Sequence, residues 1–281
     1  MKKILVVFIS ILILMPEVKS STTSASSYIL MDQNTGRVLL SKDKDSQRLI
    51  ASITKIMTCI LTLESGKSED VVIVDDNATS AYGSGIYIEV GEEIKLKDLL
   101  YGLMLRSGND AASMIAAYVS GSIEEFVKLM NNKAKELGMK NTIFYTPSGL
   151  PTPHGNLSSV YDMAILTRYA MQNKEYREIV STKKYKTATN KKTYIWHNKN
   201  KLLKYDYITG GKTGYTEESG RTLVSTANID NMNLIVVTIR DSDDWNTHLE
   251  LYNYAKDNYI SYKVLNKNKF NLIGDTYYKG N

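Results

Sequence analysis

The chain has 281 residues, 43% hydrophobic and 23% charged, a balance typical of a folded globular protein and unlike a disordered one. Its 35 basic and 30 acidic residues leave a net charge of +5 with the signs interspersed, which indicates no nucleic-acid partner. The single cysteine, Cys59, excludes an internal disulfide, and the three scattered histidines form no Cys/His cluster, so we expect no metal and no cofactor.

Residues 1–20 predict a signal peptide. Lys2 and Lys3 precede an apolar run over residues 4–15, and small residues follow at 20–25, where we expect cleavage. The run is shorter than the about 20 residues that a membrane span needs. We therefore expect an exported chain, extracellular or in the cell-wall or periplasmic space, whose membrane contact would require an uncleaved N-terminal segment.

The next elements predict a strand hairpin and then a helix. Two short apolar runs, residues 28–31 and 37–40, flank a polar turn that ends in glycine. A helical run begins at Ser52 and extends to about Glu64. A strand is expected over residues 71–74, followed by a glycine-rich loop over 80–91 with a short extended piece at 86–88.

The middle of the chain is predicted to be helical. Helices are expected over residues 96–106, from Asp110 onward and over 122–137, with a break at residues 107–109. A loop rich in proline and glycine covers residues 145–157, and another helix is expected over 159–172.

The last third is rich in predicted strands. These are residues 193–196, 210–213, 222–227 and 234–240. An amphipathic helix over 244–257 and a weakly patterned tail after Tyr262 complete the chain. This order favours an α+β fold, an antiparallel sheet flanked by helices with an inserted helical subdomain, over an alternating parallel α/β fold.

Ser52 and Lys55 form a Ser-x-x-Lys motif at the start of the first helix. Residues three apart share a helix face, so the lysine ammonium can reach the serine hydroxyl. A serine nucleophile needs such a base, and a lysine can act as one if burial or another cation lowers its pKa. The same pattern occurs at Ser41–Lys44 and Ser181–Lys184. Alone it indicates no more than a helix-capping serine.

Two further motifs carry polar groups that suit a peptide substrate. At the break between two helices, Ser107 and Asn109 can relay a proton and hydrogen-bond an amide. In a predicted strand, Lys212, Thr213 and Gly214 offer a cation, a hydroxyl and a bare backbone to a carboxylate-ended peptide. Taken alone, the first motif is better explained as a helix cap in a turn and the second as an edge strand with a solvated lysine.

Together, in this order, the three motifs are the signature of penicillin-binding proteins and class A β-lactamases. The chain resembles the low-molecular-weight penicillin-binding proteins, the serine-type D-alanyl-D-alanine carboxypeptidases, from about Tyr28 to Tyr262. The most similar segments are residues 51–58, 98–112 and 211–216. The resemblance implies a β-lactamase/transpeptidase-like catalytic domain over residues 26–262. We expect a short tail over 263–281 in place of the second β-rich domain of many relatives.

The resemblance also implies catalytic roles. Ser52 would attack the carbonyl between the two terminal D-alanines of a peptidoglycan stem peptide, with Lys55 as general base. Ser107 would help to protonate the leaving amine, and Asn109 would complete the hydrogen-bond network. The desolvated Lys55 should titrate low, helped by the nearby cation Lys212.

The remaining implied residues bind the substrate: Lys212, Thr213, Gly214, Tyr215 and Lys199. Backbone N–H groups of Ser52 and Tyr215 would form the oxyanion hole, and Lys212 with Thr213 would hold the terminal carboxylate. Lys199 stands where some members have an arginine, although the position taken alone favours a solvated strand residue. A His-x-Ser/Thr pattern common in the family is rearranged around His154, to which we assign no role.

The expected function is removal of the terminal D-alanine from pentapeptides through an acyl-enzyme, with β-lactams as acylating inhibitors. One alternative is a class A-like β-lactamase, which needs a carboxylate base on a loop beside the site. Residues 146–159 contain no Asp or Glu, and Gly108 stands between Ser107 and Asn109 where that class has aspartate. The other alternative is a non-catalytic cell-wall binding domain, against which the intact motifs count.

Overall fold

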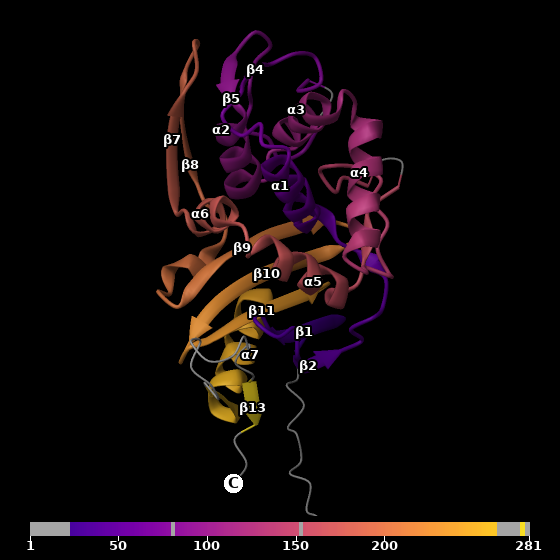
Figure 1. Cartoon of the computed structure of the whole chain (residues 1–281), viewed down its shortest axis with the longest axis vertical. Coiled ribbons are helices and arrows are strands. Elements are labelled where there is room, and N and C mark those ends of the chain that lie inside the picture. Colours follow the sequence, from indigo (N-terminus) through magenta and orange to yellow (C-terminus); the bar gives the residue numbers. More distant parts are fainter. Residues whose placement is uncertain (1–22, 80–81, 152–153, 263–275, 279–281) are drawn as a thin grey trace, which may run out of the picture.

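The computed structural model describes residues 23–79, 82–151, 154–262 and 276–278. The predicted signal peptide lies outside these residues. Figure 1 shows a central sheet with a helical region above it and one further helix beneath it.

The central sheet is antiparallel and has five strands in the order β2-β1-β11-β10-β9. Their bounds are Ser27–Asp32 (β1), Val38–Lys42 (β2), Ile208–Thr216 (β9), Gly220–Ile229 (β10) and Met232–Ile239 (β11). The predicted hairpin of β1 and β2 is present, and β1 pairs with β11 from the far end of the chain. β9 lies at the edge of the sheet, where no other strand of the described residues pairs with its outer backbone groups.

The sheet separates two hydrophobic cores. Successive strand residues point to opposite faces, and Ile29 and Leu30 accordingly belong to different apolar clusters. Helix α5 (Val160–Ala170) covers one face, with α1 (Lys55–Glu64) packed against α5, and α7 (Asp244–Asn258) covers the other face. Because both faces are covered, residues 234–239 of β11 are buried without interruption, which explains why all of them except Thr238 are apolar.

The helical subdomain is inserted between β2 and β9. It contains α2 (Leu96–Tyr101), a π-helical turn (Gly102–Arg106), α3 (Asn109–Ser120), α4 (Ile123–Glu136) and the short paired strands β4 (Val71–Ile73) and β5 (Glu93–Lys95). The predicted α+β fold, with an antiparallel sheet, flanking helices and an inserted helical subdomain, is confirmed. Among the described helices, none combines the length and apolar character required to cross a membrane.

Some local predictions were wrong or incomplete. Residues 86–88 are not extended throughout, since Tyr87 has a positive φ of 60°. The predicted helix from Ser52 begins as a 3₁₀ helix, η1 (Ala51–Thr54). The sequence analysis also missed α6 (Lys174–Ser181), which has only two turns, and β7 (Lys184–Ala188). In β7, lysines alternate with partly buried residues, so its pattern lacks apolar character.

Further short elements complete the described chain. They are β3 (Arg48–Leu49), β6 (Leu157–Ser158), β8 (Thr193–His197), a 3₁₀ helix at Lys201–Lys204, β12 (Tyr259–Ser261) and β13 (Thr276–Tyr278). β7 and β8 form a separate hairpin, and β3 pairs with β6. β12 pairs with β13, so the tail that we predicted to be weakly patterned contains a strand.

Candidate active site

The turn that carries Ser52 lies between the two layers of the molecule. Ala51 has a positive φ of 47°, which turns the chain from β3 into η1, and α1 then begins at Lys55. In a 3₁₀ helix the side chains at i and i+3 eclipse one another. Lys55 Nζ therefore lies 3.0 Å from Ser52 Oγ and donates a hydrogen bond to it.

Lys55 is fully buried and its ammonium joins three segments of the chain. Besides Ser52, it donates to Asn109 Oδ1 at 2.8 Å and to the Ser148 carbonyl oxygen at 2.6 Å. An ammonium has three N–H donors, so all three are matched with acceptors. These bonds connect η1 to the start of α3 and to the loop after residue 145.

Ser107 sits at a strained backbone position between the π-helical turn and α3. Its φ of 65° and ψ of 36° are left-handed, which is uncommon for a residue with a Cβ atom. Ser107 Oγ accepts a hydrogen bond from Lys212 Nζ at 3.0 Å. Asn109, two residues on, is held by its Nδ2 donating to the Tyr82 carbonyl at 2.7 Å. Both motif residues thus project toward η1 and β9.

Edge strand β9 packs directly against the serine turn. A Cβ atom at Gly214 would lie 2.9 Å from the Ser52 nitrogen and 2.4 Å from Thr222 Oγ1, so only glycine permits this approach. Lys212, on the same side of β9 as Gly214, is 1% exposed and also donates to the Thr213 carbonyl at 2.7 Å. Tyr215, on the other side, is 65% exposed.

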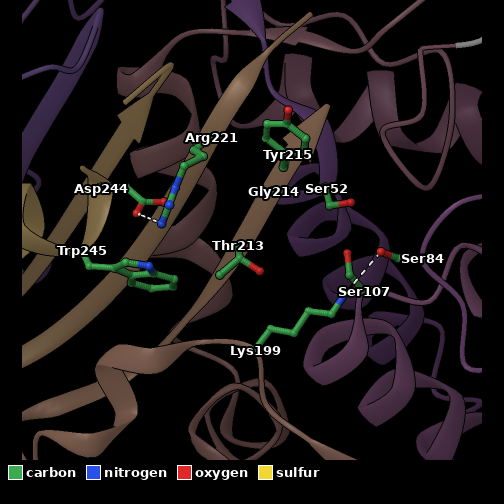
Figure 2. A pocket seen from close by; sticks show the side chains of 10 residues that line it. All are labelled: Ser52, Ser84, Ser107, Lys199, Thr213, Gly214, Tyr215, Arg221, Asp244 and Trp245. Atoms are coloured by element: carbon green, nitrogen blue, oxygen red, sulfur yellow. Dashed lines mark hydrogen bonds and ion pairs between the residues drawn. The ribbon is translucent and has the colours of Figure 1, made fainter. Parts of the chain in front are cut away.

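A cleft of about 510 Å³ opens between these segments (Figure 2). Its lining residues are Ser52, Ser84, Ser107, Lys199, Thr213, Gly214, Tyr215, Arg221, Asp244 and Trp245. Lys55, Asn109 and Lys212 are buried behind this lining. Lys199 reaches into the cleft, and its Nζ donates to Ser84 Oγ at 3.2 Å.

The clustered amines lower one another's basicity. Burial, followed by the positive charge of Lys199, lowers the pKa of Lys55 to about 7, against a smaller opposing effect of Asp110. Burial is also the main cause that holds the pKa of Lys212 well below its usual range, with Lys55 and Lys199 adding to it. After burial, the charge that most lowers the pKa of Lys55 is thus that of Lys199, whereas the sequence analysis expected it to be that of Lys212.

Comparison with known proteins places the chain in a family. The family model described as D-alanyl-D-alanine carboxypeptidase matches residues 15–243. This chain belongs to the D-alanyl-D-alanine carboxypeptidase family. It is 41% identical to D-alanyl-D-alanine carboxypeptidase DacF of Bacillus subtilis over 220 residues, which are 76% of this chain and 56% of the relative. With DacD of Escherichia coli it is 31% identical over 265 residues, 87% of this chain and 66% of the relative.

The chain therefore spans between 56% and 66% of the length of these two curated relatives. Solved structures match it more completely. A D-alanyl-D-alanine carboxypeptidase from Mycobacterium tuberculosis has a TM-score of 0.81 and 27% identity, covering 88% of this chain and 94% of that one. A variant of a Streptomyces DD-transpeptidase has a TM-score of 0.79 and 28% identity, covering 84% and 99%.

The structure brings all nine site residues named from the sequence to one place in this family member. Lys199, whose placement was open, lines the cleft. The two other Ser-x-x-Lys serines lie elsewhere, Ser41 in β2 and Ser181 at the end of α6. His154 packs its ring near Tyr145, 5.5 Å between centroids, and does not line the cleft. Among the described residues, no group of three metal-ligating side chains comes together.

Five cleft or support residues escaped the sequence analysis. Ser84 lies in the loop predicted over residues 80–91 and belongs to none of the three motifs. Ser148 contributes only its carbonyl oxygen, which no motif reveals. Arg221, Asp244 and Trp245 reach the cleft from β10 and α7, and their proximity to Ser52 exists only in the folded chain. The sequence offered one signal for Arg221. It lies six positions after Tyr215, and a tight β-hairpin places two residues at that spacing side by side on neighbouring strands.

The loop behind Ser52 is held against η1 by close backbone contact. Asn156 Nδ2 donates to Thr54 Oγ1 at 2.9 Å, and Thr58 Oγ1 donates to the Pro147 carbonyl at 2.6 Å. Gly149 has a φ of 84°, and a Cβ atom there would lie 2.0 Å from the Ala51 carbonyl oxygen. This oxygen belongs to the backbone of the serine turn, so it cannot move without moving Ser52.

Replacing Gly149 by alanine should therefore displace the serine turn. Gly138→Ala is the matched control, because Gly138 also has a positive φ of 73° but nothing within 4 Å of the added Cβ. The control should lose roughly 1–2 kcal/mol of unfolding free energy from backbone strain. Gly149→Ala should lose about 1–3 kcal/mol more from the clash. Urea unfolding measures both variants, and equal losses would contradict the importance of this contact.

Proposed function

We propose that the chain is an exported D-alanyl-D-alanine carboxypeptidase that removes the terminal D-alanine of peptidoglycan pentapeptides through an acyl-enzyme on Ser52. The observation that carries this proposal is the buried Lys55 amine, 3.0 Å from Ser52 Oγ and with a pKa of about 7. A buried lysine with lowered pKa is costly to fold around and clusters at functional sites. The family membership and the names of the relatives support the same activity.

In the acylation step, neutral Lys55 accepts the proton of Ser52 Oγ as the oxygen attacks the carbonyl carbon of the peptide bond. The negative charge moves to the carbonyl oxygen. We assign its stabilisation to the backbone N–H groups of Ser52 and Tyr215. The Ser52 N–H lies in the first turn of η1, where no intrahelical acceptor is available, so it is free to bind an oxyanion.

In the collapse step, the C–N bond breaks and the leaving amine takes the proton that Lys55 accepted from Ser52, so Lys55 is neutral again. Ser107 Oγ is placed to pass on this proton, because it lies in the cleft and is hydrogen-bonded to Lys212 Nζ. Free D-alanine leaves and Ser52 remains as an ester. A water molecule then attacks that ester while Lys55 accepts its proton. As the ester C–O bond breaks, Lys55 returns this proton to Ser52 Oγ, and the peptide shortened by one residue departs with a new carboxyl group.

Substrate binding uses the open edge of β9. An edge strand presents unpaired N–H and C=O groups with which an extended peptide can form a ladder. The Thr213 hydroxyl and the Lys199 ammonium line the cleft and are the groups we assign to the terminal carboxylate. Lys212 was expected in that role, but its burial and its bond to Ser107 make it a support for the proton relay.

A β-lactam carries the same kind of reactive amide, so we expect it to acylate Ser52. We expect the resulting ester to persist. The amine expelled when the β-lactam ring opens stays attached to the acyl group, so, unlike free D-alanine, it does not make way for a water that Lys55 could activate. Residues 146–159 contain no carboxylate that could activate a water as a class A β-lactamase does. The β-lactamase alternative is therefore disfavoured. A non-catalytic wall-binding domain would have no use for the lowered pKa of Lys55.

Export follows from residues 1–20, which carry the order of charged, apolar and small residues of a signal peptide. The proposed substrate agrees with this location, since pentapeptides attached to peptidoglycan lie outside the cytoplasm. Comparing the N-terminus of the protein recovered from its native host with the sequence would test cleavage near residues 20–25.

Mass spectrometry with benzylpenicillin tests the nucleophile. The wild-type chain should gain the mass of one penicillin and keep it after the free drug is removed. Ser52→Ala should gain nothing. Ser41→Ala, which alters another Ser-x-x-Lys serine outside the cleft, should be labelled as the wild type is. Labelling that persisted in Ser52→Ala would disprove the assignment.

A D-alanine release assay on a pentapeptide distinguishes the enzyme from a scaffold. The wild type should release one D-alanine per peptide, and Ser52→Ala should release only the background amount. A chain that reacted with penicillin but released no D-alanine would instead be a scaffold or a peptidase of different specificity.

The pH dependence of Ser52 acylation tests Lys55. The base must be neutral, so the second-order rate constant should fall about tenfold per pH unit below pH 7 and level off above it, with an apparent pKa of about 7. An apparent pKa near the about 10.4 of free lysine would contradict the proposal. Because Lys199 lowers the pKa of Lys55, Lys199→Gln should move the midpoint upward, and Lys199→Arg, which keeps the charge, should leave it close to the wild-type value.

A further inference from the structure

The cleft extends beyond Thr213 to three residues that the proposed mechanism does not use. Arg221 at the start of β10 and Asp244 and Trp245 at the start of α7 line the same cleft as Ser52 (Figure 2). They meet there because β10 pairs with the edge strand β9 and α7 packs on β10. Their chemistry, a cation beside a carboxylate and an indole, differs from the hydroxyls and amines around Ser52.

The strand register places Arg221 beside the substrate-binding side of β9. Arg221 pairs directly with Tyr215, and Leu223 pairs with Thr213. Paired residues project from the same face of a sheet, and Leu223 packs into the core under α7. The side chains of Arg221, Thr213 and Tyr215 therefore share the α7 face, and Figure 2 shows the guanidinium group on the Trp245 side of Thr213.

The guanidinium group contacts Asp244 and Trp245 and is otherwise exposed to the cleft. Its Nη2 donates to Asp244 Oδ1, and its central carbon lies 5.7 Å from the centroid of the Trp245 ring. The Asp244 side chain is 4% exposed, whereas the Arg221 side chain is 40% exposed. A guanidinium has five N–H donors, and among the described residues only Asp244 accepts a hydrogen bond from it. Several donors thus remain available toward the cleft.

The other cations near Thr213 leave room for a further contact to the carboxylate, because Lys212 is not free to bind it and Lys199 already shares its ammonium with Ser84. The Lys212 ammonium points at Ser107 and the Thr213 carbonyl and is buried behind the lining. Lys199 is bonded to Ser84, and burial together with Arg106 lowers its pKa. An arginine keeps its charge at every pH a protein tolerates, and its planar fork matches the two oxygens of a carboxylate.

We propose that Arg221 binds the C-terminal carboxylate of the substrate together with Thr213, and that Asp244 and Trp245 are positioning residues that hold the guanidinium at the cleft. This rests on the proposed function in that it names a further contact of the same substrate. The ligand class is a peptide or β-lactam with a free carboxylate next to the bond that Ser52 attacks. Asp244 prevents the arginine from turning away when no substrate is bound.

The test compares two acylating agents that differ only in this group, benzylpenicillin and its methyl ester. The second-order rate constant for Ser52 acylation is measured for both. Arg221→Gln should slow the acid by about 10- to 100-fold, the range expected for loss of a charged hydrogen-bonding partner, and leave the ester unchanged. Arg221→Lys should retain part of the preference for the acid. Asp244→Asn should reduce the preference by less than Arg221→Gln does.

The ratio of acid to ester rates distinguishes this role from a structural one. A merely structural Arg221 would slow both compounds alike in Arg221→Gln and would lower the thermal midpoint without changing the ratio. Such a uniform loss would overturn the proposal, as would an unchanged ratio in a stable variant. A uniform loss would also be the result if Arg221 contacted the acyl side of the bond, which both compounds share.

A binding measurement separates this inference from the proposed function. In the Ser52→Ala background no acylation occurs, and calorimetry compares a peptide ending in D-alanyl-D-alanine with its C-terminal carboxamide. The acid should bind more tightly, and Arg221→Gln should remove about 10-fold or more of that difference. If wild-type protein releases no D-alanine while this difference is present and depends on Arg221, the proposed activity fails and the carboxylate site stands. If the difference is independent of Arg221, the carboxylate assignment fails.

Discussion

The buried ammonium of Lys55 is the interaction on which the arrangement of the site depends. Its three hydrogen bonds join the serine turn, the start of α3 and the loop that ends in β6, three segments that approach one another from different parts of the chain. A buried amine is tolerated only when its donors are matched. The same burial that makes these bonds necessary brings the pKa of Lys55 to about 7. One physical constraint thus determines both the geometry and the basicity of the site.

The sheet supplies the second constraint, because β9 must lie close to the serine turn. Glycine at position 214 allows its backbone to approach the Ser52 nitrogen, and Gly211 allows the same strand to lie against the Val224 carbonyl of β10. The remaining neighbours of β9 are then set by register, which brings Arg221 beside Tyr215. Cations therefore reach the cleft from two layers, Lys199 from the segment after β8 and Arg221 from the sheet.

The features of the fold and the site that the sequence predicted are those whose residues lie close together along the chain. Ser52 and Lys55 are neighbours within one turn, and the motif at Lys212 is contiguous, so the sequence alone identified them. The π-helical turn before Ser107 and the 3₁₀ start at Ser52 were missed, because both depend on tertiary packing and differ from an α-helix by one hydrogen-bond step. The contact of Arg221 with Asp244 spans two elements and leaves no periodicity in the sequence.

The pairing of β1 with β11 has a consequence for how the molecule is made. The first strand of the sheet can acquire its inner neighbour only after residue 239 is available, since β11 lies between β1 and β10. Contacts so distant along the chain close slowly, because loop-closure entropy must be overcome before they stabilise anything. The helical subdomain can form from local contacts earlier. The active site around Ser52 is therefore completed late in folding, when β9 packs against the serine turn. A partly folded chain contains Ser52 but lacks the strand that would bind a substrate beside it.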